Sequence, residues 1–517
     1  VRGRLPQGAI RGSEKVLLRL YPGVFSAVLE GIEGVFRKPY GCFEQTSSAT
    51  YPNVLVLDYL RRSGQAKPDI EAKAIEYIQQ GYQRLLSYEV RGGGFEWFGR
   101  EPANQVLTAY GLLEFADMAK VYDVDPAVIR RTQEWLLSKQ KYDGTWEPDR
   151  SSLRDGLYRD ELSGRYGTTA YIAWALLESG YRGDATDRAL SYLASRASET
   201  EDPYTLSLVA NALLAGGRDR MASSVLERIV AKAREHDGKV WFPAGGRTAV
   251  YSAGSSADVE ATSLATLALT RAAASDRTGA MLDWLLSRRD PLGGWGSTQA
   301  TVLALRTLLR SSATRQDAEA NAEVQVRFAS ETVETIEIRP ESSDLVRTFD
   351  LTRFAKPGKP LELELAMTGK ARAQYQLVTL AWVPKPRKEE SLVLSVDYDR
   401  VTLAPDDTIT ARARATWKQR GPSGMVLLAL GIPPGFEVEA SSVGKLVAEG
   451  KVGKFTITGK ELLLYVDHLE PNRPSEFAYK LKARYPVKAK APASLAYLYY
   501  QPEVRAESGT VDLHVKR

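Results

Sequence analysis

The chain has 517 residues, of which 44% are hydrophobic and 26% charged, and its formal net charge is +5. Single hydrophobic cores stop growing at about 250–300 residues, so this length and composition predict a soluble globular protein of two to four domains. The small positive charge is interspersed with acidic residues and indicates no nucleic-acid interface, and a single cysteine excludes intrachain disulfides and zinc sites built on paired cysteines.

The sequence contains no apolar run of about 18 residues, which a membrane-spanning helix would need. It begins at Val1 without an initiator methionine or a signal peptide, so we expect a processed or expressed piece of a longer protein. None of its five asparagines begins an Asn-x-Ser/Thr glycosylation site, which weakly favours a bacterial source over a glycosylated animal secretion.

The first segment with a clear pattern is Lys15–Leu20, which is short and apolar and precedes the break Tyr21-Pro22-Gly23. It predicts one strand of a β domain. The apolar residues that follow take helical spacing on one side: Val28, Ile32, Val35 and Phe36. We therefore expect β structure to give way to helices near residue 21.

The stretch Pro39–Ser48 reads Pro-Tyr-Gly-Cys-Phe-Glu-Gln-Thr-Ser-Ser and holds the only cysteine, Cys42. Residues three apart lie on one face of a helical turn, so the Cys42 sulfur can reach the side-chain carbonyl carbon of Gln45. Attack by the thiolate there would expel ammonia and leave an internal thioester. Gly41 has no β-carbon to crowd so tight a ring, and the flanking aromatics Tyr40 and Phe43 could cover it. Such a bond lasts in water only if it is kept dry.

Three small polar residues follow the glutamine: Thr46, Ser47 and Ser48. We expect them to cap the helix that starts in this region. A Cys-x-x-Gln pair alone does not establish a thioester, because a free cysteine usually behaves as a small, buried and inert hydrophobic residue.

A unit recurs from here to about residue 310: a turn with glycine and an aromatic residue, then a helix that opens on threonine and runs through small residues and leucine. Its copies pair Gly94–Trp97 with Thr108–Leu113, Gly144–Trp146 with Thr169–Trp174, Val240–Phe242 with Ala261–Leu267, and Gly293–Gly296 with Thr298–Leu303. A further helix, Thr205–Leu213, fits between them without a tryptophan turn. Periods of roughly 35 to 60 residues suit helix hairpins, and closing the series gives an α/α toroid. The alternative is an open superhelix of helix pairs.

Two β regions follow the helices. The segment Ser311–Asp317 is typical of a linker, and Pro384–Glu390, rich in proline and charge, is typical of a second one. Between them the apolar period becomes two, at Val324, Val326 and Phe328 and at Leu361, Leu363 and Leu365. Beyond the second linker we expect the strands of a sandwich at Leu392–Val396, at Ala411–Ala415, at Met425–Leu428, and through Phe477, Tyr479, Leu481 and Tyr485.

The string around Cys42 resembles the thioester motif of the α2-macroglobulin and complement family, and Leu5-Pro6 and Gly12-Ser13 precede it as in that family. The glycine–tryptophan repeats resemble the family's thioester domain. Four further motifs resemble its C-terminal receptor-binding domain: Gly424–Leu427, Gly435-Phe436, Tyr465–Asp467 and Pro492–Glu503. Phe43 stands where animal members commonly carry glycine, so the match is closer to the bacterial-type α2-macroglobulins, and receptor clearance of the animal type should not be inferred.

The resemblance implies a multidomain α+β fold, in which an α/α toroid is inserted in a CUB-like β domain and followed by a C-terminal β-sandwich. We expect residues 1–20 and 316–385 to form the CUB-like domain, residues 21–315 the toroid and residues 386–517 the receptor-binding-like sandwich. Cys42 and Gln45 would form the thioester without a metal or cofactor. The rest of the motif would support them: Pro39, Tyr40, Gly41, Phe43 and Glu44.

Two other kinds of chemistry are compatible with parts of the sequence: terpene cyclisation, and cysteine protease or glutaminase catalysis. Gln140–Trp146 fits the Gln-x-x-x-Gly-x-Trp repeat of triterpene cyclases, but their acidic cluster is missing, and the nearest candidate, Asp123–Pro126, is typical of a turn before a helix. A cysteine protease or glutaminase would need a histidine to activate Cys42. The histidines are all far from it in sequence, and the first is expected in a solvated turn: His236, His468 and His514.

Complement-like members that transfer to hydroxyls use a toroid histidine before the helix that corresponds to Thr169-Ala170-Tyr171. The stretch Ser151–Arg165 has no histidine, so the resemblance predicts direct transfer to lysine amines. In the family, aromatic residues of the last domain cover the thioester, and Tyr499 and Tyr500 match that position. The alternative places both tyrosines on a final strand in the sandwich core.

The sequence therefore predicts the C-terminal part of a broad-spectrum protease inhibitor that acylates its target once, and not a turnover enzyme. Its partners would be target proteases, held through a lysine amide, and the upstream macroglobulin domains and bait region of the parent chain. The expected location is periplasmic or extracellular, which allows a membrane anchor in the missing upstream part. The alternatives are a thioester opsonin or adhesin that tags cell surfaces, and a toroid enzyme such as a terpene cyclase.

Overall fold

A computed structural model describes residues 1–21, 39, 41–62, 66, 68–149, 161–290, 293–312, 321–328, 331–339, 346–356, 358–369, 373–383 and 391–516. The chain divides into two compact units, Val1–Pro386 and Arg387–Arg517. Several expected features lie outside the described residues: the helical pattern through Val28–Phe36, Tyr40, residues 150–160 and most of both linkers. No described helix is both long and apolar enough to cross a membrane.

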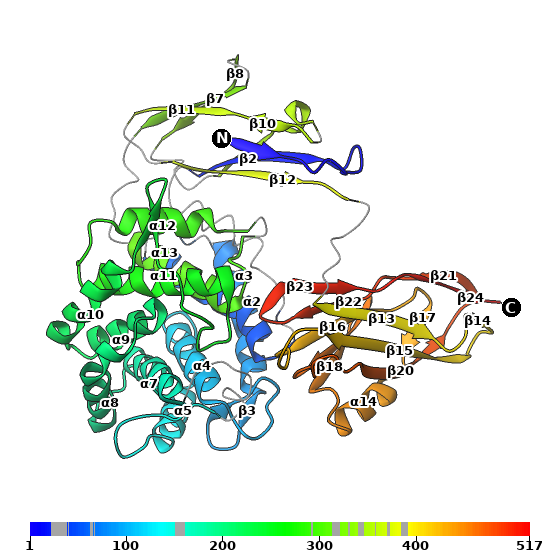
Figure 1. Ribbon diagram of the computed structural model, residues 1–517, viewed down its shortest axis with the longest axis horizontal. Coiled ribbons are helices and arrows are strands. Elements are labelled where there is room, and N and C mark those ends of the chain that lie inside the picture. Colours follow the sequence, from blue (N-terminus) through cyan, green and yellow to red (C-terminus); the bar gives the residue numbers. More distant parts are fainter. Residues whose placement is uncertain are drawn as a thin grey trace. The chain divides into compact units, whose positions relative to one another are not determined.

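Six helices of the described chain form a closed ring in the first unit (Figure 1). In ring order they are α2 (Phe43–Arg62), α4 (Gln105–Met118), α7 (Glu161–Glu178), α9 (Pro203–Ala215), α11 (Gly254–Arg271) and α13 (Thr298–Ser312). Each packs on the next, and α13 packs back on α2. These helices are apolar and buried nearly all round, as helices in the middle of a large core must be. The closed ring confirms the toroid and rules out the open superhelix.

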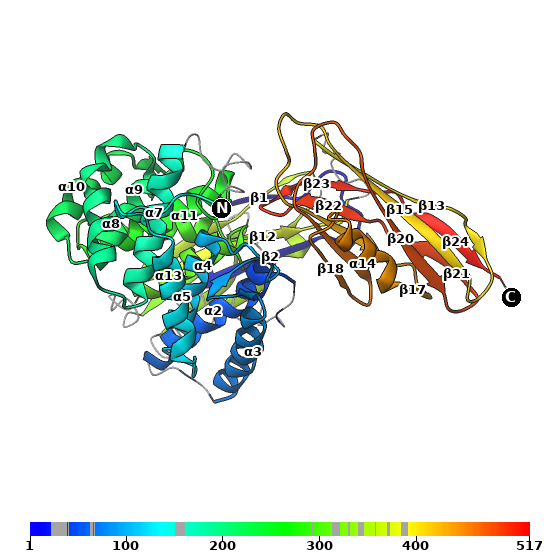
Figure 2. The same ribbon diagram turned by 90° about the horizontal axis from the view of Figure 1, so that it is seen from below.

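A second set of helices packs around the ring. They are α3 (Pro68–Leu86), α5 (Pro126–Ser138), α8 (Asp184–Ser195), α10 (Asp219–Ala231) and α12 (Thr278–Ser287), each against the preceding inner helix. They are amphipathic: α3 buries Ala74, Ile78, Gly81 and Leu85, which repeat at helical spacing on one face. In both views α8 and α10 lie at the rim, outside α7 and α9 (Figures 1 and 2).

The glycine–aromatic repeat is explained by one hydrogen bond. The backbone N–H of each aromatic residue donates to a threonine hydroxyl on the next inner helix: Phe95 to Thr108 (2.8 Å), Trp146 to Thr169 (3.0 Å), Phe242 to Thr262 (3.1 Å) and Trp295 to Thr301 (3.0 Å). The two tryptophans also donate their indole N–H to the preceding outer helix, at the carbonyls of Leu136 and Leu285. The expectation that threonine opens each helix is confirmed for α13, which begins at Thr298, and is wrong for α4, α7 and α11, which begin at Gln105, Glu161 and Gly254.

Short hairpins complete the turns of the ring. They are β3 (Glu89–Val90) with β4 (Gly94–Phe95), and β5 (Arg234–His236) with β6 (Lys239–Trp241). Asp125 caps α5 by accepting from the N–H of Ala127, which confirms the turn expected at Asp123–Pro126. Helix α13 runs on to Ser312, so Ser311 and Ser312 belong to the helix and not to the linker.

Strands from both sides of the helical region pair with one another in the first unit. β1 (Arg2–Arg4) pairs with β10 (Pro360–Glu362), and β2 (Lys15–Tyr21) lies between β9 (Arg347–Asp350) and β12 (Gln374–Leu380). β7 (Ala322–Phe328) lies between β8 (Glu331–Ile338) and β11 (Glu364–Gly369). One hydrophobic core joins these sheets. The alternation at Leu361, Leu363 and Leu365 is confirmed as β structure and is divided between two strands, because β10 ends at Glu362 and β11 begins at Glu364.

The second unit contains sheets that share one hydrophobic core. One sheet orders β13 (Leu392–Tyr398), β15 (Thr408–Trp417), β20 (Ser475–Ala483) and β17 (Phe436–Val438), and another β18 (Lys454–Ile457), β19 (Glu461–Val466), β16 (Val426–Gly431), β22 (Leu495–Leu498) and β23 (Gln501–Glu507). A third joins β14 (Thr402–Leu403), β24 (Val511–Val515) and β21 (Val487–Ala491), and α14 (Ala440–Ala448) packs on β20. The expected strands are confirmed except at Tyr485, which is exposed between β20 and β21.

The threonine acceptor can be tested at Thr169, which is fully buried. Thr169→Val keeps the shape of the side chain but leaves the Trp146 N–H without an acceptor, which should cost about 1–3 kcal/mol and lower the urea midpoint of the helical circular dichroism signal. Thr169→Ser keeps the hydroxyl and should lose much less. Equal losses in the two variants would show that packing, not the hydrogen bond, makes the contribution.

Candidate functional site

Cys42 lies directly before the first residue of α2 and is buried. Its backbone N–H donates to the side-chain carbonyl oxygen of Gln45, Oε1, at 3.2 Å. Gly41 has a φ of +79°, a conformation that L side chains rarely adopt, and a β-carbon there would lie 1.6 Å from Gln45 Oε1 and 2.6 Å from its Cδ. The Gln45 carboxamide therefore folds back over Gly41 toward Cys42, and only glycine leaves room for it.

This arrangement suits acyl transfer between the two side chains. A hydrogen bond to the Gln45 carbonyl oxygen draws electron density from its carbon. The same N–H can stabilise the negative charge that develops on the oxygen when a nucleophile attacks. The nucleophile nearest in sequence is the Cys42 thiol, and its burial restricts competition from water.

The backbone before Cys42 is held by residues that the sequence did not single out. The Gly41 carbonyl accepts hydrogen bonds from the Tyr88 hydroxyl and from Arg84 Nη2, the latter at 3.0 Å. Burial raises the pKa of Tyr88, so its hydroxyl stays protonated and can donate. Arg84 stands in the last turn of α3 and Tyr88 just beyond it. No pattern in the sequence linked these residues to the cysteine.

Trp97 fixes the start of α2 from the other side. Its carbonyl accepts from the N–H of Phe43 at 2.9 Å, and its indole N–H donates to the buried carboxylate of Glu44 at 2.8 Å. The ring of Trp97 also contacts Tyr251 edge-on. The sequence assigned Trp97 to the structural repeat alone, whereas the structure makes it a partner of the Cys42 motif.

Phe43 anchors the helix in the core. Its fully buried ring packs against the rings of Tyr88, Phe95 and Tyr110, with centroids 5.4 to 6.3 Å apart. The side chain therefore fixes the first residue of α2 in the hydrophobic core, and its role as cover stays a prediction. Pro39 is buried.

The polar residues after Gln45 do not cap the helix, because α2 already begins at Phe43. The N–H of Thr46 donates to the backbone carbonyl of Cys42 at 2.9 Å, and the Ser48 hydroxyl donates to the backbone carbonyl of Gln45 at 2.7 Å. The Ser47 hydroxyl instead donates to Glu114 Oε2 on the neighbouring inner helix, α4, at 2.5 Å. The capping prediction is wrong, and Ser47 ties the thioester-motif helix to its neighbour.

Two glutamates are fully buried on the inner helices. Burial raises the pKa of Glu114 to about 8, although the Ser47 hydrogen bond opposes the rise. Burial also raises the pKa of Glu260 on α11 to about 8; Ser252 and Thr248 lower it, and the charge of Glu44 raises it. Both carboxyls are therefore mainly protonated at neutral pH. The sequence offered a signal, since apolar and small residues flank each glutamate directly: Leu113 and Phe115 beside Glu114, and Val259 and Ala261 beside Glu260.

One of the three histidines lies in the first unit with Cys42, and the other two lie in the second unit. His236 is exposed on the β5–β6 hairpin beside Asp237, which does not fit a partner for a buried thiol. In the second unit, His468 contacts Glu470 at 3.1 Å and His514 lies on β24. Within the described ranges, no group of three His, Cys, Asp or Glu side chains is placed to hold a metal ion.

Tyr499 and Tyr500 form the turn between β22 and β23. Both are half-buried, and their rings meet edge-on with centroids 5.0 Å apart. The alternative that placed them on a strand in the sandwich core is wrong, because the hydrophobic core of the described part of this unit does not include them.

Comparison with known proteins gives consistent matches along the chain. The family model described as the A-macroglobulin TED domain matches residues 17–310, and the one described as the A-macroglobulin receptor binding domain matches residues 421–509. Ovostatin of Gallus gallus is 27% identical over 519 aligned positions, which cover 96% of this chain and 35% of ovostatin. The chain thus spans about a third of the length of that relative.

Solved structures show the same fold. Salmonella α2-macroglobulin reacted with methylamine superposes with a TM-score of 0.71 at 18% identity, over 100% of this chain and 33% of that one. A native portion of Escherichia coli α2-macroglobulin that runs to its C-terminus gives a TM-score of 0.67 at 15% identity, over 100% of this chain and 80% of that one.

The buried carboxyl of Glu114 predicts a pH dependence of stability. Its pKa in the folded protein is about 8, above the ordinary value of 4.5, so between these values the folded state holds a proton that the unfolded chain releases. The free energy of unfolding should therefore fall as pH rises, by up to about 1.4 kcal/mol per pH unit from this group. Glu114→Gln cannot ionise, so its stability relative to the parent should rise between about pH 5.5 and 7.5.

Urea midpoints at several pH values measure this difference. The control is Glu227→Gln, at an exposed position on α10, which should follow the parent curve. Parallel curves for the parent and Glu114→Gln would show that Glu114 is ionised in the folded protein.

Proposed function

The chain belongs to the A-macroglobulin family, and on that premise we propose that it is the thioester-bearing C-terminal part of an inhibitor that traps proteases covalently. The observation that carries the proposal is the contact between the Cys42 N–H and Gln45 Oε1, over a glycine that no other residue could replace. It favours a bond between these two side chains.

The proposed bond forms when the Cys42 thiolate attacks Gln45 Cδ. The carbon–nitrogen bond breaks, ammonia leaves with the proton of the thiol, and a thioester joins Sγ to Cδ. The N–H of Cys42 stabilises the oxygen during this step. Burial of Cys42 and the fixed Gly41 carbonyl then favour a thioester that survives until a rearrangement exposes it.

The proposed reaction with a target is aminolysis. A neutral lysine amine attacks the Gln45 carbonyl carbon, the carbon–sulfur bond breaks, and Cys42 leaves as a thiolate that takes up the released proton. The product is an amide between Gln45 and the protease lysine. Because Gln45 is consumed, the device works once and is not a turnover enzyme. A bait region and upstream macroglobulin domains in the parent chain would supply the trigger.

The rest of the chain has a place in this proposal. We assign residues 21–315 to the thioester toroid, residues 1–20 and 316–385 to a CUB-like domain, and residues 386–517 to the receptor-binding-like sandwich. The pairing of β2 with β9 and β12 supports the split β domain. We place the parent protein in the periplasm or outside the cell, where it would meet foreign proteases.

The cyclase-like motif is accounted for by structural contacts. Gln140 Nε2 donates to the Gly144 carbonyl at 3.0 Å and to the Ala185 carbonyl at 2.8 Å, while the Trp146 indole binds Leu136. The motif thus joins the turn after α5 to the next outer helix, α8. Nothing in these contacts favours substrate cyclisation over the thioester proposal.

Intact mass and thiol titration of fresh protein test the thioester. We expect a mass lower than the sequence mass by one ammonia and a thiol that reacts only after methylamine is added, with one methylamine incorporated per chain. Glycerol should give far less product, because no histidine is expected to direct transfer to hydroxyls. A fresh chain at its sequence mass with a freely reactive Cys42 would falsify the proposal.

Gly41→Ala provides the matching variant. The added β-carbon collides with the Gln45 carboxamide, so this chain should stay at the sequence mass with a free thiol. Gly180→Ala is the control, because Gly180 also has a positive φ, +88°, but a β-carbon there meets nothing within 4 Å. Loss of the thioester in both variants would point to general strain and not to the collision.

Tyr499 and Tyr500 are proposed as the cover of the thioester. Replacing either with alanine should speed spontaneous loss of the bond, by about tenfold if the tyrosine adds about 1.4 kcal/mol to the barrier to hydrolysis. Appearance of the free thiol over time measures the rate. Tyr485→Ala, at an exposed tyrosine of the same unit, should leave the rate unchanged. Unchanged rates in all three variants would assign the cover to other residues.

A further inference from the structure

A cavity of about 330 Å³ lies at the C-terminal ends of α2, α4 and α13, at the opposite end of α2 from Cys42. Its volume falls in the range of small-molecule sites, about 300–1,000 Å³. Six charged side chains line it: Asp58, Arg62, Asp117, Lys120, Arg306 and Arg310. The proposed thioester chemistry uses none of them.

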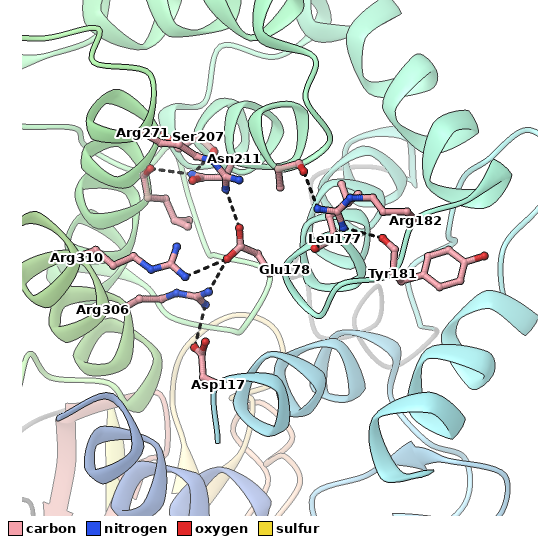
Figure 3. A network of polar contacts seen from close by, with 12 residues as sticks. Asp117, Leu177, Glu178, Tyr181, Arg182, Ser207, Asn211, Arg271, Arg306 and Arg310 are labelled. Carbon is pink, nitrogen blue, oxygen red and sulfur yellow. Dashed lines mark hydrogen bonds and ion pairs between the residues drawn. The ribbon is translucent and has the colours of Figure 1, made fainter. Parts of the chain in front are cut away.

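Arg306, which lines this cavity, joins carboxylates of two neighbouring helices (Figure 3). Its side chain is only 3% exposed, and it lies between Asp117 on α4 and Glu178 on α7, at 3.7 Å and 2.8 Å. Arg310, one turn further along α13, reaches the same Glu178 oxygen at 3.2 Å, and Arg271 on α11 reaches the other oxygen at 2.8 Å. Three guanidinium groups thus converge on one carboxylate.

Positive charge exceeds negative charge in this network. Arg62 pairs with Asp58 and Lys120 with Asp117, so five cationic side chains face three carboxylates in the pairs described. The charge of Arg306, and then burial, lower the pKa of Arg310, which is the effect of like charges held together. Burial would raise the pKa of Glu178, but Arg306 and its neighbours hold it at about 2, so this carboxylate is already fully ionised.

One buried donor also lacks an acceptor. In the described part of the chain, the Arg306 Nε is buried and has no hydrogen-bond partner. Buried donors of charged groups are nearly always satisfied, because leaving one unpaired is costly. Partial negative charge at the helix C-termini stabilises nearby cations, which explains part of the cluster, but it supplies no acceptor for this N–H.

We propose that this cavity binds a small oxyanion, a phosphate or carboxylate group, against the guanidinium groups of Arg62, Arg306 and Arg310. Guanidinium is the side chain best suited to such anions, because it stays charged and offers several donors in one plane. The bound anion would offset the excess of positive charge where three inner helices end. This inference does not depend on the thioester, which lies at the other end of α2.

Thermal unfolding of the 517-residue chain tests the site, with inorganic phosphate or succinate titrated against chloride at constant ionic strength. We expect a saturable rise in the unfolding temperature with at least one of the two anions. The anion whose effect saturates shows whether the site takes a phosphate or a carboxylate group. Arg310→Gln should weaken the apparent affinity by about tenfold or more, which corresponds to a lost charge-assisted hydrogen bond.

Arg62→Gln is the second variant, because this exposed side chain can be removed without loss of the buried pairs, and it should weaken binding as well. The matched control is Arg218→Gln, whose arginine pairs with Asp187 on the surface between outer helices and should bind as the parent does. Cys42→Ala should also bind as the parent does. No saturation with either anion, or equal shifts in Arg310→Gln and Arg218→Gln, would overturn the proposal and leave neutralisation of the helix ends as the role of the arginines.

Discussion

The contact between the Cys42 N–H and the Gln45 carboxamide depends on glycine at position 41, both for its backbone conformation and for the space left by its missing β-carbon. Gly41 turns the chain with a φ of +79°, and its missing β-carbon is the space in which the carboxamide lies. Once the chain turns there, α2 begins at Phe43, and residues three apart are brought together at its first turn. The relative position of Cys42 and Gln45 is therefore set by where α2 begins, and the contacts that hold this helix start also hold the two side chains together.

The ring of inner helices provides this fixation. Three side chains of α2 contact residues of α4. Phe43 packs against Tyr110, Ser47 donates to Glu114, and Tyr51 donates to Asp117 at 2.8 Å. Each of these residues lies about one turn after the last along α2. The helix is thus attached to α4 over more than two turns by one apolar and two polar contacts, so α2 cannot turn about its axis without breaking them.

Much of this could be predicted from the sequence, and the reasons differ by element. The toroid followed from the recurrence of glycine, aromatic and threonine, because a repeated hydrogen bond needs the same residues at each copy. The spacing of Cys42 and Gln45 suggested the pair, and the resemblance of the surrounding string to the family motif selected it. The capping role of Ser47 was wrong because spacing does not show where a helix starts, and Arg84, Tyr88 and Trp97 could not be found because their contacts join residues far apart in the chain. The alternation from Leu361 to Leu365 indicated β structure but could not show the break between two strands, because alternation continues through it although the strands pair with different partners.

The two ends of α2 differ in the state of their buried charges, and this difference bears on the proposed chemistry. Near Cys42, burial keeps Glu114 and Glu260 mainly protonated, so neither carboxyl is a strong base at neutral pH that could activate a water molecule. At the other end, arginines keep Asp117 and Glu178 ionised, and the pKa of each is held at about 2. Charged groups are not absent from the reactive end, because the Glu44 carboxylate accepts from the Trp97 indole and Arg84 donates to the Gly41 carbonyl. There they hold the start of α2 in place, whereas at the far end the arginines join α13 to α4 and α7 through Asp117 and Glu178.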